Sequence, residues 1–346
     1  MADKSLFNIT YEWNGQEADE IFAKPIFTDP ELLKQFRIIP NVKSKKRLAV
    51  DSLLQKILKK KAGCARTPSG EVINISQVDI TVERVGVDLE QCATTLEDSI
   101  MEEHLNKGND IYNLDGTTIK PYIEKKVKEA LQLDIPRVGY FGDVADTDPN
   151  YNQIDGVWKV LAAYAATNPD MKIADIPATL PDEDTEAGAK EIIALFKDLY
   201  KAQSNVLKAL PKQRKRYIVN AEIMDALIDA YTTLGGKMNG DIYLKRTQDG
   251  VGVEAAYYKG IEVVPMAHWS DIIDTDFGGS QKWRMILTDT DNICLGTDRV
   301  EDAMTVEIMY HPYQKVNTID AEFKLGVQII WPELTVYRTS PVVAQV

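Results

Sequence analysis

The chain has 346 residues, of which 44% are hydrophobic and 27% are charged, and its formal net charge is −13 at pH 7. This composition is ordinary for a globular protein, and the length allows a sizeable core in one large domain or two smaller ones. The negative charge argues against a dedicated nucleic-acid binder, and no apolar run approaches the ~18 residues of a membrane span.

Residues 1–35 are polar and carry only isolated apolar side chains, so this segment is predicted to dock elsewhere or to remain mobile. Residues 36–92 contain two basic runs, at 43–47 and 59–61. From Val78 to Leu89 apolar and polar residues alternate, which predicts one half-buried strand. Because an isolated hairpin is marginal in water, we expect residues 36–92 to form a long two-stranded excursion that rests on a neighbour.

A long amphipathic helix is predicted to begin at Ile119 and to end before Pro136. About 17 residues at ~1.5 Å each would make a rod of roughly 25 Å. Its apolar stripe, at the spacing of one helical face, consists of Ile119, Ile123, Val127, Ala130 and Leu131. We expect Ile119, Ile123, Val127 and Leu131 to face a sheet of the same chain and the Lys and Glu face to point to solvent or a neighbour.

Further helices are predicted over 157–166 and after the acidic residues 182–184, the second carrying apolar residues from Ile192 to Leu207 and ended by Pro211. A short buried strand at 216–220 leads into another helix, for which Asn220 is the expected N-cap and Gly235 the expected C-cap. The pattern then changes to strands, at 260–265, 283–288, 293–296, 304–310 and 322–331. Helices packed on mixed strands predict an α+β fold.

The search for catalytic residues finds no candidate. The three histidines share no local motif, and the chain has no His-Glu-x-x-His, no Cys-x-x-Cys and no phosphate-binding Gly-x-x-x-x-Gly-Lys. His268, beside Trp269 and Asp271, could act as a general base, but an interface or surface histidine is the favoured interpretation. The widely spaced Cys64, Cys92 and Cys294 predict reduced, buried thiols.

Acidic pairs recur, and carboxylates suit hard cations such as calcium or magnesium, but none has the spacing of a calcium loop. The pairs are Asp146 and Asp148, Asp182 and Asp184, Asp274 and Asp276, and Asp289 and Asp291. Residues 289–292 are predicted to form a hairpin turn, with a metal site as the lesser alternative. Residues 235–240 follow a helix instead of opening one, which predicts a connection and not an anion loop. We therefore predict no catalytic, cofactor-binding or metal-binding residues.

Several segments occur in an order that resembles a known family. They are Tyr217–Asn220 followed by Met224 and Leu227, Tyr258–Pro265, Arg284–Gly296, Phe323–Trp331 and Leu334–Arg338. Together with the long helix, this order resembles the major capsid proteins of tailed bacteriophages, whose Hong Kong ninety-seven type fold is shared by encapsulins. The resemblance covers nearly the whole chain, and its order carries more weight than any single motif.

The resemblance implies a domain plan. Residues 1–35 would be an N-terminal arm, 36–92 an extended two-stranded loop, and 93–150 a peripheral domain with a spine helix. Residues 151–300 would be an axial domain with insertions, and 301–346 would supply return strands of the peripheral domain and a closing axial strand. No coiled-coil stretch precedes residue 35, so we expect a separate scaffolding protein or a chain in mature form.

The resemblance also implies a function. The chain would be a structural major capsid protein, without enzymatic activity or cofactor, that assembles into an icosahedral head shell around double-stranded DNA. Its expected partners are copies of itself in pentamers and hexamers, together with portal, scaffolding and decoration proteins. We also expect weak, non-specific contact with packaged DNA and no membrane contact. The expected location is the virion, after assembly in the host cytoplasm.

Two alternatives remain open at this point. The first is an encapsulin-like nanocompartment shell that encloses a cargo enzyme. Neighbouring terminase and portal genes would indicate a phage capsid, and a neighbouring gene for a cargo enzyme would indicate the compartment. The second, of a different class, is a metal-dependent hydrolase that uses the Asp pairs. It would require three or more carboxylates converging in one pocket with a bound cation.

Overall fold

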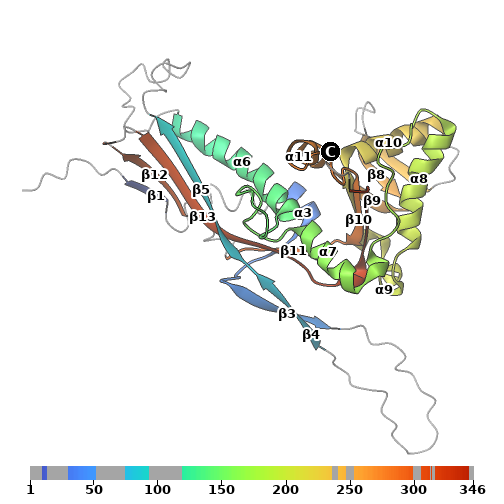
Figure 1. The fold of residues 1–346 in the computed structure, drawn as a ribbon, viewed down its shortest axis with the longest axis horizontal. Helices are drawn as coiled ribbons and strands as arrows, with labels where there is room; N and C mark the ends of the chain where they lie inside the picture. The colour runs from blue at the N-terminus through green and yellow to red at the C-terminus, as the bar shows by residue number, and fades with distance from the viewer. Residues whose placement is uncertain are drawn as a thin grey trace, which may run out of the picture.

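The computed structural model describes residues 10–13, 30–51, 75–92, 119–235, 241–246, 253–298, 305–311, 313 and 316–342. These residues form two six-stranded sheets and a separate two-stranded ribbon, with helices packed beside both sheets (Figure 1). The large sheet consists of β1 (Thr10–Trp13), β2 (Arg37–Ile39), β5 (Glu83–Cys92), β11 (Ile293–Gly296), β12 (Thr305–His311) and β13 (Val316–Ile329). The second sheet consists of β6 (Lys215–Asn220), β7 (Ile242–Arg246), β8 (Val253–Tyr258), β9 (Ile261–Met266), β10 (Arg284–Asp289) and β14 (Thr335–Thr339).

The ribbon pairs β3 (Lys45–Asp51) with β4 (Ile75–Thr81) in antiparallel fashion. The helices are α3 (Pro30–Gln35), α6 (Ile119–Phe141), α7 (Val157–Thr167), α8 (Glu186–Lys201), α9 (Asn205–Ala209), α10 (Ala221–Thr233) and α11 (Trp269–Asp276). Short 3-10 turns are η2 (Pro169–Met171), η3 (Lys212–Arg214) and η4 (Pro332–Leu334).

β13 is the central strand of the large sheet, and it pairs antiparallel with β5, β11 and β12. Its buried apolar side chains occur at every second position from Ile319 to Ile329, whereas Glu322 on the opposite face is exposed. Because successive side chains of a strand point to opposite faces, β13 presents one apolar face to the core. That core also contains side chains from α6, α7 and α11.

The long helix lies against this core as the sequence predicts. Val127 and Leu131 are buried in the same cluster as β13, whereas Lys125 and Lys126 are exposed, which confirms the prediction for these four residues. Ala130, which the sequence places in the apolar stripe, is exposed. The side chains of Ile119 and Ile123 lie outside the described residues.

The predicted end of the helix before Pro136 is wrong, because α6 continues to Phe141. A proline inside a helix cannot donate a hydrogen bond to the carbonyl four residues before it, and this usually ends or kinks the helix. Here the residues that follow, Val138, Tyr140 and Phe141, are all buried in the core of the large sheet. Their burial offsets the lost hydrogen bond.

The single strand predicted from Val78 to Leu89 is two strands in the structure. β4 pairs with β3, whereas β5 pairs with β13, and the chain changes partner at Val82. Val82 is buried, and its amide donates to the Ser44 carbonyl at 2.9 Å. The alternation in the sequence continues across the break and therefore does not reveal the change of partner. The predicted two-stranded pairing is confirmed for β3 and β4, but β5 belongs to the large sheet.

The strand-helix unit β6–α10 forms as predicted, but the side chain of Asn220 does not cap the helix. Its amide nitrogen donates to Ser270 Oγ at 2.8 Å and to the Lys282 carbonyl at 3.1 Å. Its amide oxygen accepts from the backbone of Arg284 at 2.8 Å, so Asn220 joins β6 to α11 and β10. Gly235 follows the end of α10 with φ 61°, which confirms its predicted position at the C-terminus of the helix.

The single helix predicted between the acidic residues 182–184 and Pro211 is two helices in the structure. α8 ends at Lys201, and Ser204 begins α9 by accepting a hydrogen bond from the Leu207 amide at 3.1 Å. The Ser204 hydroxyl donates to the Glu333 carbonyl at 2.7 Å, near the start of β14. The break therefore anchors the helices to η4, which lies far along the chain.

Candidate functional site

The chain passes from the second sheet to the large sheet between β10 and β11, and it returns between β13 and β14. The sequence predicts a hairpin at 289–292, and a turn is present there, closed by the Asn292 amide and the Asp289 carbonyl at 3.2 Å. The prediction of a hairpin is nevertheless wrong, because β10 pairs with β6 and β14 while β11 pairs with β2 and β13. The turn is one of the connections between the two sheets.

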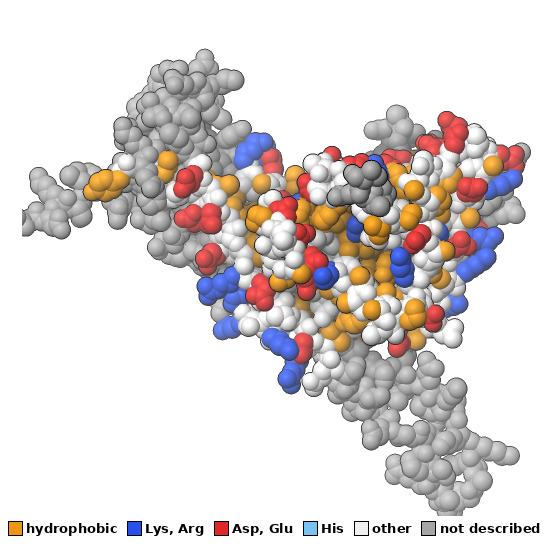
Figure 2. Space-filling view, viewed as in Figure 1, with side chains coloured by type: hydrophobic (Ala, Val, Ile, Leu, Met, Phe, Trp, Pro, Cys, Tyr) orange, Lys and Arg blue, Asp and Glu red, His pale blue; other side chains and the backbone are white. Residues whose placement is uncertain are grey.

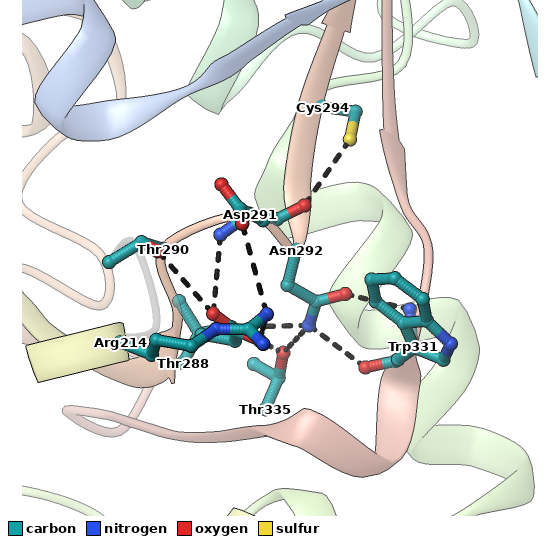
Figure 3. Close-up of polar contacts among 9 residues, drawn as sticks. Arg214, Thr288, Thr290, Asp291, Asn292, Cys294, Trp331 and Thr335 are labelled. Atoms are coloured by element: carbon teal, nitrogen blue, oxygen red, sulfur yellow. Dashed lines mark hydrogen bonds and ion pairs between the residues drawn. The ribbon is translucent and has the colours of Figure 1, made fainter. Parts of the chain in front are cut away.

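Asn292 joins the two crossings (Figure 3). Its amide nitrogen donates to the Trp331 carbonyl and to Thr335 Oγ1, both at 2.8 Å, and to Thr288 Oγ1 at 3.2 Å. Its amide oxygen accepts from the Trp331 backbone at 2.7 Å. The side chain is fully buried, and these bonds give both the amide nitrogen and the amide oxygen protein partners in place of water.

A buried carboxylate supports the same turn. Asp289 is 1% exposed, and its Oδ2 lies 2.7 Å from Nη2 of Arg214. The Thr290 amide donates to the Arg214 carbonyl at 2.8 Å, which fixes the turn to the segment before β6. The Arg214 side chain is 47% exposed, so only the carboxylate of this ion pair is buried, and loss of Arg214 would leave that buried charge without compensation.

Arg284 connects the second sheet to the helices of the large sheet, and the sequence does not reveal this role. Its guanidinium carbon lies 5.0 Å from the ring centroid of Phe141 and 4.9 Å from that of Trp158. Its Nε donates to the Gln281 carbonyl at 2.9 Å. Burial lowers the pKa of Arg284 to about 10, still far above neutrality, so that the stacked group is a cation.

The histidines and cysteines do not form a catalytic arrangement in the described part of the chain. His268 precedes α11 and lines a groove of about 310 Å³ together with Pro136 and Arg137. His104 lies outside the described residues, as do Cys64 and the side chains of His311 and Cys92. Cys294 is buried as predicted, and burial raises the pKa of its thiol to about 12.

The acidic pairs mostly bind groups of their own segments. Asp146 and Asp148 each accept from the backbone amide two residues ahead, at 3.0 and 2.9 Å, and Asp274 pairs with Lys282. Among the described residues, no three His, Cys, Asp or Glu side chains gather in a way that could hold a metal ion. The described helices include none that is long and apolar enough to cross a membrane.

Charges are separated on one face of the molecule. In Figure 2, Asp and Glu side chains lie over the large sheet, and Lys and Arg side chains gather where the ribbon leaves it. Asp88, Glu90 and Glu322 are exposed on the large sheet. Of the basic run, Lys45 and Arg47 are exposed and pair with Asp79 of the ribbon, at 2.7 and 3.6 Å.

Comparisons with known proteins identify the fold. No family model matches the chain, and no curated protein matches its sequence. A chain in the structure of the satellite phage P4 procapsid including the size determination (Sid) protein is similar in structure, with a TM-score of 0.57 and 12% identity over 94% of this chain and 88% of that one. The chain has the Hong Kong ninety-seven type capsid fold.

Two further structures share this capsid fold. A chain of Gordonia phage Cozz has a TM-score of 0.51 and 12% identity over 91% of this chain and 87% of that one. A chain of the capsid of the native GTA particle has a TM-score of 0.50 and 10% identity over 90% of each chain. These matches confirm the predicted α+β fold class, and at such low identity the likeness concerns the fold alone.

Proposed function

We propose that this chain is a structural major capsid protein that assembles into an icosahedral shell around double-stranded DNA. The observation that carries the proposal is the match to a chain of the satellite phage P4 procapsid, which spans 94% of this chain with a TM-score of 0.57. A likeness over 94% of the chain extends over nearly its whole length. In this role the chain acts without catalysis, and its location is the virion.

In this proposal the elements are assigned to the domains of the capsid fold as follows. Residues 1–35 act as the arm, and 36–92 as the extended loop that contains the ribbon. α6 is the spine helix of the peripheral domain within 93–150, and residues 151–300 form the axial domain with most of the second sheet. Residues 301–346 supply β12 and β13 to the peripheral domain and β14 to the axial domain.

Shell assembly on this plan depends on many modest contacts that symmetry repeats. The surface offers two kinds of contact. Leu133 and Val144 are more than half exposed, although large apolar side chains are usually buried. The acidic surface of the large sheet and the basic root of the ribbon have complementary charges, which favours contact between copies.

The proposed partners follow from the same role. They are further copies of this chain in pentamers and hexamers, a portal, a scaffolding protein, decoration proteins and packaged DNA. The contact with DNA is weak and non-specific, because the net charge of −13 opposes tight phosphate binding. Assembly takes place in the host cytoplasm.

The test is to purify the chain, alone and with a scaffolding protein encoded beside it, and to image both samples by negative-stain electron microscopy. Closed shells or rings of five and six subunits are the expected result. A stable monomer in both samples would overturn the proposal. Shells that always copurify with one enzyme in their interior would instead favour the encapsulin-like compartment.

A further inference from the structure

The ribbon β3–β4 leaves the large sheet next to β11 and β13 (Figure 1). Its root is not a free loop, because Ile80 and Val82 are buried in a small core of their own. The remaining buried members of this core are Ile39, Val42, Cys294 and Ile330. The direction of the ribbon therefore depends on how closely its root can approach the sheet.

Two glycines form the surface that the root contacts. Gly296 of β11 and Gly326 of β13 are directly opposite each other in the antiparallel register, and both are buried. Neither has a positive φ, so their backbone conformation does not require glycine. Glycine is required because the ribbon root leaves no space for a side chain above these two residues. We call Gly296 and Gly326 the glycine socket.

A side chain on either glycine would collide with the ribbon root. A Cβ on Gly326 would meet the Thr81 carbonyl far inside 3.0 Å and would lie 3.1 Å from Val82 Cα. A Cβ on Gly296 would meet Ile80 Cδ1 at 2.8 Å and Val82 Cγ1 at 3.2 Å. The obstacle at Gly326 is backbone, which cannot rotate away, whereas the nearest obstacle at Gly296 is the end of a side chain.

Hydrogen bonds on either side of Gly326 hold the ribbon at the same place. Lys324, two residues before the glycine, donates from Nζ to the Lys43 carbonyl at 2.6 Å. Gln328, two residues after it, donates from Nε2 to the Asp79 carbonyl at 3.0 Å. Positions 324, 326 and 328 share one face of β13, so that one stripe of this strand contacts the segment before β3 at Lys43 and the ribbon itself at Thr81 and Asp79.

We propose that the glycine socket fixes the angle at which the ribbon leaves the large sheet, and thereby sets where one copy of the chain meets the next. Gly296 and Gly326 are positioning residues in this scheme. The second half of the inference rests on the proposed capsid function, whereas the first half concerns the subunit alone.

The angle can be measured by pulsed electron paramagnetic resonance between spin labels on Arg47→Cys in the ribbon and Lys190→Cys on α8. Both native side chains are well exposed. In every variant Cys64 and Cys92 are replaced by Ser, whereas Cys294 is kept because it is buried. The labelled protein is diluted into an excess of unlabelled protein. Each glycine variant is compared with Gly86→Ala, a matched control in β5 whose added Cβ would make only an ordinary contact at 3.5 Å.

We expect the distance distribution to shift or broaden for Gly326→Ala and Gly296→Ala and to remain unchanged for Gly86→Ala. Adding Ile80→Val to Gly296→Ala removes the Cδ1 methyl and should restore most of the original distribution. If Gly326→Ala does not fold, Gly296→Ala and its double variant still decide the question. Unchanged distances in Gly296→Ala, or an equal change in Gly86→Ala, would overturn the inference about the angle.

The same variants are then imaged as assembled particles. We expect glycine variants with a displaced ribbon to form shells of altered diameter or open sheets and tubes, while Gly86→Ala forms particles of wild-type size. Wild-type diameters despite a displaced ribbon would refute the link between the socket and assembly. If the unmodified chain forms no particles at all, the proposed function fails together with that link, while the distance measurement still decides the role of the socket.

Discussion

At the residue scale, the junction between the two sheets depends on Asn292, a buried side chain whose hydrogen bonds to protein groups take the place of hydrogen bonds to water. The two amide hydrogens of Asn292 are shared among three acceptors, and its amide oxygen accepts from the Trp331 amide, all within the buried turn region (Figure 3). A buried polar group destabilises a protein when it lacks such partners. The junction is therefore sensitive to any change that leaves these partners unpaired.

Replacement of Asn292 by Ala should lower the free energy of unfolding by about 3 kcal/mol, because it leaves several buried groups without partners. Asn292→Asp should be at least as destabilising, since a carboxylate cannot donate to the Trp331 carbonyl. Urea unfolding monitored by tryptophan fluorescence measures both effects, with exposed Asn152→Ala as the control. A loss below about 1 kcal/mol in both Asn292 variants would contradict the role assigned to this side chain.

Two buried tyrosines should respond in opposite ways to loss of the hydroxyl. The hydroxyl of Tyr258 has no hydrogen-bond partner among the described residues, so Tyr258→Phe should leave stability unchanged or raise it by up to about 1 kcal/mol. The hydroxyl of Tyr151 donates to Asp276, so Tyr151→Phe should lower stability by about 1–2 kcal/mol. Thermal unfolding of the two variants side by side tests this, and equal losses would contradict it.

At the element scale, the turn that follows α6 is held by close backbone contacts and one ion pair. The Gly156 amide donates to the Gly142 carbonyl at 2.8 Å, and a Cβ on Gly156 would lie 2.7 Å from the Tyr140 carbonyl oxygen. Lys159 Nζ lies 2.7 Å from Asp143 Oδ2 and ties the turn to α7. The end of α6 is thus fixed to the start of α7.

This ion pair predicts a pH dependence. Burial raises the pKa of Asp143, but hydrogen bonds from Lys159 and the Ala145 amide, together with the Lys159 charge, outweigh it and hold the pKa below the ordinary 3.8. Because the folded pKa is depressed, the contribution to stability is present above pH 3.8 and is lost as the pH falls through the folded value.

The difference in melting temperature between wild type and Lys159→Gln should therefore shrink as the pH is lowered from about 6 to below the ordinary carboxyl value. Lys190→Gln is the control, because its pair with Glu186 has side chains that are 61% and 73% exposed. Such an exposed pair contributes little. A difference that stays constant over the whole pH range would show that the Asp143–Lys159 pair is not its source.

Elements whose signals are local could be predicted from the sequence. The buried strand β6, the helix α10 with Gly235 after its end, and the apolar side of α6 around Val127 all follow from periodicity and end signals. The break at Val82 and the separation of β10 from β11 could not, because each depends on the choice of a partner strand far along the chain. The same holds for the junction, where Asn292 could be recognised as a turn residue while its partner Trp331 is 39 residues away.

At the scale of the whole molecule, the balance of charge limits what the protein can bind. With a net charge of −13, the unassembled chain should bind double-stranded DNA no more tightly than ~10⁻⁶ M at physiological salt and should release it as salt is raised. Fluorescence anisotropy with a labelled duplex measures this affinity. Tight binding that persists at high salt would contradict the prediction.

The position of any residual DNA contact can be tested with matched charge reversals. Lys45→Glu with Arg47→Glu removes the exposed basic charges at the ribbon root, and Lys190→Glu with Lys201→Glu makes the same change on α8. We expect the first pair to weaken the residual binding more than the second, because Lys45 and Arg47 belong to the basic run at 43–47. If both pairs of substitutions weaken DNA binding equally, the DNA contact does not lie at the ribbon root.

The length of the ribbon has a mechanical consequence. Each of its strands has seven residues, which at ~3.3 Å per residue makes an arm of roughly 23 Å. A rotation of about 10° at the glycine socket would carry the far end of this arm through roughly 4 Å, close to the spacing between neighbouring strands. A small rotation at the glycine socket is thus magnified into a displacement of several ångströms at Asp51 and Ile75, the far ends of the two strands.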